Sequence, residues 1–414
     1  YTRAQAVAGV STAAPGAPPM TRGRSARRPG FGWDIRAFHA ESDARLANAA
    51  ILQDLEGGAT SIALQIAAPG GFGLAYNGDE IAAALDGVDL ALCPVALVAG
   101  EYTQDASGSL MALWRARKLP EEQWKGELGA DPLGTLARTG ALYHPLAKSL
   151  EVAARLAAGT RAMPGVKALV ADGHPYHAAG ASEAQELAAM LATLLSYLRA
   201  CEAVGLAPAD ALPKISVGLA ADADQLMTIA KLRAGRRLVW RIGDACGAGI
   251  AANSVEIASA TAWRMLARRD PWVNLLRNTI ACAGAAMGGA DAICVLPFTW
   301  PLGKPDAFSR RIARNTHVVL QEESGLGRVA DPAGGSFAIE RLTDDLARKA
   351  WEIFQSWEAA GGMGAALTSG LVQDQIAAVA TARARDIATL HQPLTGTSAF
   401  PRLGDHGMTV EPWP

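Results

Sequence analysis

The chain has 414 residues, of which 50% are hydrophobic and 19% charged, and its formal net charge is −2. This size fits one large domain with extensions or two ordinary domains, and the near-neutral charge excludes a basic field that would hold nucleic acid. No apolar run reaches the roughly 20 residues that cross a bilayer, and the first thirty residues lack the apolar core of a signal peptide.

The cysteines are odd in number and widely spaced along the chain: Cys93, Cys201, Cys246, Cys282 and Cys294. No CxxC pair occurs, so the sequence predicts neither a zinc site nor a disulfide framework. These features are typical of a reduced compartment, and we expect a cytoplasmic protein. The sequence begins at Tyr1 rather than Met, as a trimmed chain or a fragment would.

Residues 1–30 are rich in Pro, Gly, Ala and Arg and have no periodicity, which predicts a flexible or draped arm. Order is expected to start near Phe31. From residue 60 onward, short apolar runs alternate with amphipathic helices, as in parallel strands that are buried on both faces. The predicted strands are Thr60–Ala67, Val95–Gly100, Lys125–Asp131 (the weakest pattern), Val166–Asp172, Lys214–Ala220, Val255–Thr261, Ala290–Leu296 and Gly335–Glu340.

The helices between these runs carry clear start and stop signals. Ser182 with Gln185 predicts a capping box, and Gly205 ends that helix. Three further helix starts are expected at Asp222 with Gln225, at Asp270-Pro271, and at Thr343.

Seven or eight strands that alternate with helices favour an α/β fold of the (β/α)₈ TIM-barrel type, with an N-terminal arm and C-terminal helices. An open doubly wound sheet is the rival, but its phosphate-binding GxGxxG spacing is missing from the first loop, Pro69–Gly73. We expect an arm over residues 1–30, a barrel with flanking helices over 31–395, and a tail over 396–414 that starts a linker.

Chemistry in such barrels lies where strands end, and the richest of these loops is Asp172–His177. Asp172, His174 and His177 could supply acid–base groups or metal ligands, or they could simply bond the backbone of a turn. The loop also approaches the cobalamin-ligand pattern DxHxxG. Position 177 is His rather than Gly, so we reject that match and predict no metal site.

The segment Val255–Arg264 ends another predicted strand with small residues. They could leave room for a ligand or could pack closely against a helix. Ser259 has no evident partner that would activate it as a nucleophile. Together with Arg264 it completes the candidate residues that could face a substrate or cofactor.

Several long segments resemble the methylmalonyl-CoA mutase family. They are Ala220–Ala234 (AADADQLMTIAKLRA), Ala307–Asp331 (AFSRRIARNTHVVLQEESGLGRVAD), Pro332–Glu340 (PAGGSFAIE) and Thr343–Met363 (TDDLARKAWEIFQSWEAAGGM). The likeness runs from about Gly32 to Leu394, and segments of this length are specific. In the family, PAGGSFAIE corresponds to a strand that follows the QEES turn.

The sequence departs from the catalytic chain of this family where that chain carries its substrate-facing motifs. The catalytic strand ends like RTHSQTSGW, with a histidine over the substrate, and here Ala258 falls at that position. A methyl group can neither bond a thioester carbonyl nor donate a proton. The catalytic GYHMQEAG turn aligns with Gly173–Gly180, which puts His177 where a glutamine is expected. WDIRAFH, at Trp33–His39, replaces the catalytic TIRQYAGFS motif.

Two other segments, Thr261–Arg277 and Gly288–Phe298, resemble the family's small subunit. That resemblance implies a stabilising, non-catalytic barrel that forms a heterodimer with a catalytic large subunit. Adenosylcobalamin would then serve the complex without being bound by a domain of this chain, since family members normally continue into a cobalamin-binding domain. Two alternatives stay open: an active acyl-CoA mutase barrel with its cobalamin domain on another chain, and a barrel that binds a CoA-like ligand without chemistry.

Overall fold

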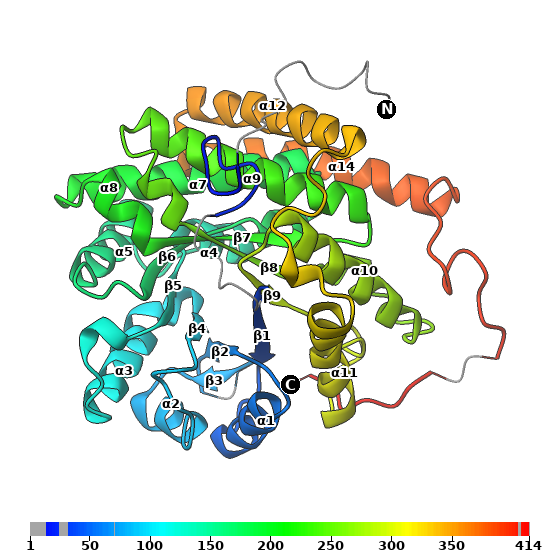
Figure 1. Cartoon of the computed structure of the whole chain (residues 1–414), viewed down its shortest axis with the longest axis horizontal. Helices are drawn as coiled ribbons and strands as arrows, with labels where there is room; N and C mark the ends of the chain where they lie inside the picture. The colour runs from blue at the N-terminus through cyan, green and yellow to red at the C-terminus, as the bar shows by residue number, and fades with distance from the viewer. Residues whose placement is uncertain (1–13, 25–31, 70, 405–406, 414) are drawn as a thin grey trace.

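The computed structural model describes residues 14–24, 32–69, 71–404 and 407–413. Eight parallel strands form a closed barrel, because β1 pairs with β2 on one side and with β9 on the other (Figure 1). The barrel strands are β1 (Asp34–His39), β2 (Ser61–Ala67), β4 (Val95–Val98), β5 (Gly126–Ala130), β6 (Val166–Asp172), β7 (Ile215–Ala221), β8 (Glu256–Thr261) and β9 (Ala292–Cys294). A two-residue strand, β3 (Leu74–Ala75), pairs beside β2. The barrel prediction is confirmed and the open sheet is excluded.

One predicted strand is wrong, and one real strand was not predicted. Gly335–Glu340 contains no strand, because helix α12 begins at Phe337 after a turn in which Gly335 has φ +85°. A run this short can begin a helix or form a strand, and its periodicity does not decide between them. The missing barrel strand is β1, which carries charged residues and therefore does not read as a continuous apolar run.

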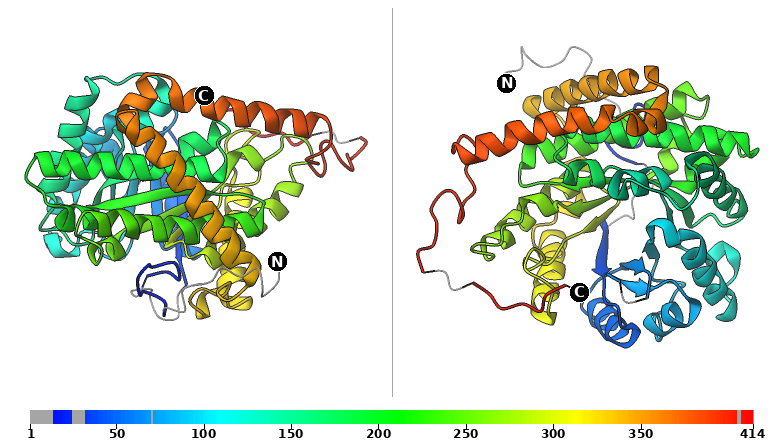
Figure 2. Two further views of the ribbon diagram at one scale, coloured as in Figure 1. Left: turned by 90° about the horizontal axis from the view of Figure 1, so that it is seen from above. Right: turned by 180° about the vertical axis from the view of Figure 1, so that it is seen from behind.

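Helices surround the barrel, and a second layer covers part of this ring. The helices are α1 (Ala44–Glu56), α2 (Gly78–Ala84), α3 (Thr103–Ala116), α4 (Pro132–Thr139), α5 (Leu146–Gly159), α6 (His174–Ala178), α7 (Glu183–Ala203), α8 (Pro208–Ala211), α9 (Gln225–Ala245), α10 (Val273–Gly288), α11 (Ala307–Val318), α12 (Phe337–Ala359), α13 (Gly362–Thr368) and α14 (Leu371–Ala388). Helix α12 packs across α7 and α9, and α14 lies alongside this layer (Figure 2).

Short helical turns complete the described secondary structure. The 3₁₀ turns are Gly100–Tyr102, Glu121–Gln123, Leu212–Lys214, Ala251–Ser254, Trp263–Met265 and Leu326–Arg328, and Val319–Glu323 is a π-helical turn. Within the described residues, no single helix is long and apolar enough to cross a membrane. The bent pair Glu183–Ala203 and Pro208–Lys214 passes that test only when its two helices are taken together.

The predicted helix starts had mixed outcomes. Ser182 and Gln185 form the expected capping box at the start of α7. Asp224, rather than Asp222, caps α9, because Asp222 binds Ala223 N–H and Arg264 instead. Helix α10 begins at Val273, two residues after the predicted Asp270-Pro271 cap, and Thr343 lies inside α12.

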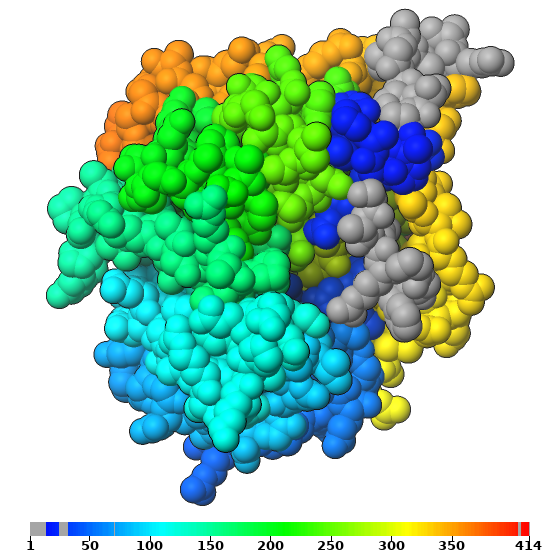
Figure 3. Space-filling model, turned by 60° about the vertical axis from the view of Figure 1, so that its left-hand side comes forward, coloured from blue at the N-terminus to red at the C-terminus, as the bar shows by residue number. Residues whose placement is uncertain are grey.

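Both predicted terminal parts contact the barrel where the structure describes them. The arm over 1–30 lies largely outside the described residues. In its described part, residues 14–24, Met20 and Thr21 are buried, and an Arg22 nitrogen lies 2.9 Å from an Asp331 oxygen. Figure 3 shows this segment in dark blue on the surface beside a hollow. In the tail, Trp413 packs on Trp300 with the ring centroids 4.8 Å apart.

Candidate functional site

Asp172 and His174 lie together at the C-terminal end of the barrel. Asp172 is the last residue of β6, and one of its carboxylate oxygens lies 2.5 Å from His174 Nδ1. The other accepts a hydrogen bond from Arg138 at 3.0 Å. The pair lies across Gly218 of β7, where a Cβ would come within 2.9 Å of His174 Nδ1. Only glycine leaves room for the pair in this position.

Asp172 and His174 each stabilise the charged form of the other. Burial opposes ionisation of both groups, but the nearby His174 and Arg138 outweigh it and hold the pKa of Asp172 below its usual range. In the same way, burial alone would lower the pKa of His174, but the Asp172 carboxylate outweighs burial and raises it. His174 is therefore an imidazole stabilised as a cation, which can act as a proton donor.

His177 and Arg264 belong to a second cluster, centred on Asp222. An Asp222 oxygen lies 3.3 Å from His177 Nε2 and 3.2 Å from Arg264 Nε. Arg264 also donates to the carbonyl oxygens of His177 and Ala181, at 3.0 Å and 2.7 Å. His177 is 2% exposed, and burial lowers its pKa, so the imidazole is held neutral. This cluster fixes α6 to the loop after β8 and has the features of a structural contact.

Ser259 and Ala258 offer no reactive group. Ser259 is buried, and its hydroxyl donates to the carbonyl oxygen of Leu219 at 2.7 Å, so its proton is already engaged. Ala258 pairs in register with Gly218 of β7 and Ala292 of β9. Three neighbouring strands thus carry only a hydrogen atom or a methyl group at this level of the barrel.

The structure also has a polar cavity that the sequence reasoning missed, the N-terminal mouth. It has a volume of about 340 Å³ and lies at the amino-terminal ends of the barrel strands. Its charged lining residues are Arg24, Asp34, Arg36, Lys125, Glu127, Lys167, Glu256 and Asp291. One sequence signal could have found most of them, since several barrel strands carry a charged residue among their first three positions.

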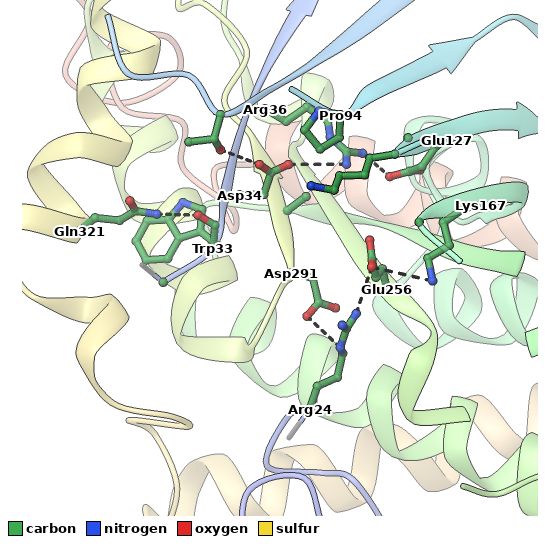
Figure 4. A pocket seen from close by; sticks show the side chains of 16 residues that line it. Arg24, Trp33, Asp34, Arg36, Pro94, Glu127, Lys167, Glu256, Asp291 and Gln321 are labelled. Atoms are coloured by element: carbon green, nitrogen blue, oxygen red, sulfur yellow. Dashed lines mark hydrogen bonds and ion pairs between the residues drawn. The ribbon is translucent and has the colours of Figure 1, made fainter. Parts of the chain in front are cut away.

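Ion pairs link these charges across the mouth (Figure 4). Arg36 lies 2.5 Å from Glu127, whose other carboxylate oxygen accepts a hydrogen bond from Ser216 at 3.0 Å. Arg24, from the arm, reaches between Glu256 at 3.4 Å and Asp291 at 3.7 Å. Burial opposes the charge of Arg36, but the nearby carboxylates outweigh it and raise its pKa. The four cations and four carboxylates that line the mouth balance, which leaves no excess positive charge for a phosphate group.

Comparison with known proteins finds relatives along almost the whole chain. The model of the family "Methylmalonyl-CoA mutase" matches residues 1–411. The chain is 49% identical over 402 residues to the methylmalonyl-CoA mutase small subunit of Streptomyces virginiae, covering 97% of this chain and 64% of the relative. It is 41% identical to the probable small subunit of Mycobacterium tuberculosis H37Rv, covering 94% of this chain and 63% of that relative.

The small subunit of Propionibacterium freudenreichii subsp. shermanii is 37% identical, over 97% of this chain and 62% of the relative. The chain thus spans a little less than two thirds of the length of these relatives. Because the family model covers almost the whole chain, and because relatives well above 30% identity carry the same family name, this chain belongs to the methylmalonyl-CoA mutase family.

Proposed function

We propose that this chain is a small-subunit component of a methylmalonyl-CoA mutase, and that it stabilises the complex rather than catalysing the reaction. At the level of the complex, that reaction is the interconversion of methylmalonyl-CoA and succinyl-CoA in the cytoplasm. The observation that carries the proposal is Ala258, flanked in register by Gly218 and Ala292. These three positions offer no side-chain hydrogen bond to a substrate carbonyl.

The balanced N-terminal mouth supports the same reading. A CoA ligand carries several phosphate charges, which an unbalanced cationic site would attract. Here Arg24 and Arg36 are already paired with carboxylates. The alternative of a barrel that binds an acyl-CoA without chemistry is favoured only by the volume of the mouth, about 340 Å³. We therefore rank acyl-CoA binding without chemistry second, after the stabilising role.

The proposed cofactor of the complex is adenosylcobalamin, which supplies the radical chemistry of such rearrangements. Its axial ligation does not fit the two candidate imidazoles of this chain. His174 turns Nδ1 to Asp172, and its Nε2 is enclosed; His177 turns Nε2 to Asp222. Because His174 Nε2 is buried and His177 is only 2% exposed, neither ring is accessible to an external metal, and we place the cofactor on the catalytic subunit.

The activity test uses the purified chain with adenosylcobalamin and methylmalonyl-CoA. We expect no succinyl-CoA and no change in the cobalamin absorbance spectrum. Ala258→His should not restore turnover, because positioning and cofactor binding contribute far more than the ~10²–10⁴-fold of one acid–base group. Turnover by the unmodified chain would overturn the non-catalytic role and favour the active-barrel alternative.

The proposed partner is the catalytic large subunit, bound through helices around the barrel. Trp357 of α12 is buried, and its Nε1 donates to Gln375 at 3.0 Å, whereas Trp351 on another face is only partly buried against Arg241. We propose that Trp351 meets the partner, so Trp351→Ala should weaken association by about 2 kcal/mol, as aromatic hot spots do. A permanent interface should bury ~2,000 Å² or more in total. Isothermal titration calorimetry of the two subunits checks the first value.

A further inference from the structure

A second cavity lies between α4, α5 and the start of α3, at the C-terminal ends of β4 and β5. Its volume is about 520 Å³, within the range of small-molecule sites, roughly 300–1,000 Å³. We call it the α4–α5 cavity. The residues that line it are Gly100, Glu101, Thr103, Gln104, Asp105, Ala130, Asp131, Pro132, Thr135, Leu142, Tyr143, His144, Ser149, Val152, Ala153, Arg155 and Leu156.

Two buried oxygen atoms at the wall of this cavity make no hydrogen bond to the described residues. Asp131 caps α4, and its Oδ1 accepts bonds from Gly134 N–H at 2.9 Å and from Tyr197 at 2.5 Å. Its Oδ2 accepts no hydrogen bond from the described residues, and an Arg138 nitrogen lies 3.7 Å away. Thr135 Oγ1, one turn along the helix, is likewise buried and unbonded within the described chain. Burying such an atom without a hydrogen bond costs free energy, and a ligand that donates a hydrogen bond to it can offset this cost.

The rest of the cavity is largely apolar on one side. Val152 and Leu156 lie one turn apart on α5, with Ala153 between them, and Leu142 and Pro132 extend the wall. Aliphatic side chains of this kind favour burial of a ring or a short hydrocarbon chain. The cavity therefore has an apolar wall and two oxygen atoms that can accept a hydrogen bond from a ligand.

The charged residues around the cavity determine which charge a ligand should carry. Glu101 and Asp105 stand at its rim in addition to Asp131. The one lining arginine, Arg155, is engaged by Glu151, with the two charged groups 2.7 Å apart. Asp131 has Arg138 3.7 Å away, but Glu101 and Asp105 add two further carboxylates at the rim, so the lining favours a cation and repels an anion.

We propose that the α4–α5 cavity binds a small organic ammonium ion, with its ammonium N–H groups donating to Asp131 Oδ2 and Thr135 Oγ1 and its apolar body against Val152 and Leu156. This site is separate from the barrel interior, and it does not depend on the chain's role in a mutase. A phosphate- or carboxylate-bearing metabolite does not match its charge.

The titration of Asp131 supports the same ligand class. Burial raises the pKa of this carboxyl to about 7, against the opposing effect of Arg138. A bound cation favours the ionised carboxylate, so the affinity should rise from pH 6 to pH 8 while the amine itself stays protonated. The other titratable or charged groups that face Asp131 or the cavity are Arg138, Asp172, Tyr176, Tyr197, Glu101, Asp105, Tyr143, His144 and Arg155. His144 is the histidine among these groups, so its replacement by Gln is the control for the pH profile.

The experiment compares three probes that each contain a phenyl ring and differ in their polar group: 2-phenylethylammonium, 2-phenylethanol and phenylacetate. Ligand-observed NMR titrations on the full chain give their affinities. We expect the ammonium to bind about tenfold more tightly than the alcohol, as for a charge-assisted hydrogen bond, and phenylacetate to bind more weakly than both. Equal affinities for the cation and the anion would overturn the proposal.

Two variants locate the binding site. Thr135→Val removes the unbonded hydroxyl at nearly constant volume; it should leave stability unchanged or slightly raised and weaken ammonium binding about fivefold. Val152→Trp should fill the cavity and abolish binding, whereas Ala147→Trp, on the exposed side of the same helix, should not change it. If Val152→Trp does not fold, Thr135→Val decides alone. Unchanged ammonium affinity in Thr135→Val and in folded Val152→Trp would refute the site.

Discussion

Both ends of the barrel hold ion pairs, but they differ in the buried atoms that stay without a hydrogen bond within the described residues: nitrogens of Arg24 at the N-terminal mouth, and both nitrogen and oxygen atoms at the C-terminal end. At the N-terminal mouth, Arg36 with Glu127, and Arg24 with Glu256, form ion pairs across the opening. At the C-terminal end, several buried polar atoms keep no hydrogen bond within the described chain, among them His174 Nε2, Thr135 Oγ1 and Asp131 Oδ2. In TIM barrels the C-terminal face carries function and the N-terminal face stability. The unbonded Asp131 and Thr135 oxygens thus lie at the end of the barrel where TIM barrels bind their ligands.

The largest effect is expected from breaking the buried pair at the N-terminal mouth. Glu127→Ala leaves Arg36 buried without its closest partner and should cost about 4 kcal/mol in free energy of unfolding. The double variant Arg36→Met with Glu127→Leu should recover most of this loss, because neither member of the pair is left alone and Asp34, 3.7 Å from Arg36, keeps its hydrogen bonds from Thr60 and Ser61. Urea denaturation followed by circular dichroism checks both. A single variant as stable as the double would show that the pair does not lock the mouth.

A buried histidine behind Trp33, a lining residue of the same mouth, should give a pH effect. His317 accepts a hydrogen bond from Trp33 Nε1 at 2.9 Å, and burial lowers its pKa to about 3. Unfolding frees the imidazole to bind a proton below about pH 6.5, so this group's contribution is lost as pH falls from there toward 3. The loss should reach about 3 kcal/mol at pH 4, and His317→Gln, which keeps an acceptor, should remove it. Parallel acid dependence of wild type and variant in denaturant melts would contradict this.

The arm should contribute less than the strands. Arg24 lies 3.4 Å and 3.7 Å from its two carboxylates and makes no hydrogen bond to the described residues through Nε or Nη1. We expect Arg24→Ala to cost less than about 1 kcal/mol in urea melts. A loss as large as that of Glu127→Ala would mean that the arm, and not the strands, closes the mouth.

At the C-terminal end the expected effect is followed as a pKa rather than as a change in stability. Asp172→Asn removes the carboxylate that holds the His174 pKa above its ordinary value, so that pKa should fall. The raised pKa stabilises the fold below the unfolded value of His174 and ceases to do so as pH rises through the folded value. NMR titration of the His174 ring protons follows this directly, with His391 as an exposed reference. An unchanged His174 pKa would show that Arg138, and not His174, is the main partner of Asp172.

Much of this architecture could be predicted from local sequence. The weak pattern at Lys125–Asp131 is strand β5, although Gly126 and Gly129 have positive φ; at both positions a Cβ would lie within about 2 Å of a carbonyl oxygen of β4. The proximity of Asp172 and His174 also follows from two positions in one loop. Strand β1 was missed because its charged residues do not read as an apolar run. Arg36 is stabilised there by an ion pair with Glu127, which lies 91 residues away in the sequence.

The two cavities could not be predicted for the same reason. The N-terminal mouth joins the first residues of strands that are far apart in sequence, and the α4–α5 cavity joins Gly100, Thr135 and Leu156 from separate loops and helices. No period or motif connects such positions, because only closure of the barrel brings them together. Ala258 is the exception: the sequence marks it by comparison with the catalytic pattern, and the structure adds its small neighbours.

Sedimentation velocity of this chain mixed with a catalytic large mutase subunit from the same source tests the stabilising-subunit role. We expect one faster-sedimenting 1:1 complex at micromolar concentration, weakened by Trp351→Ala, and a catalytic subunit that is more stable within it than alone. Formation of a homodimer in place of this complex would favour the CoA-binding alternative. Independent sedimentation of the two chains, with an equally stable catalytic subunit, would contradict the stabilising-subunit role.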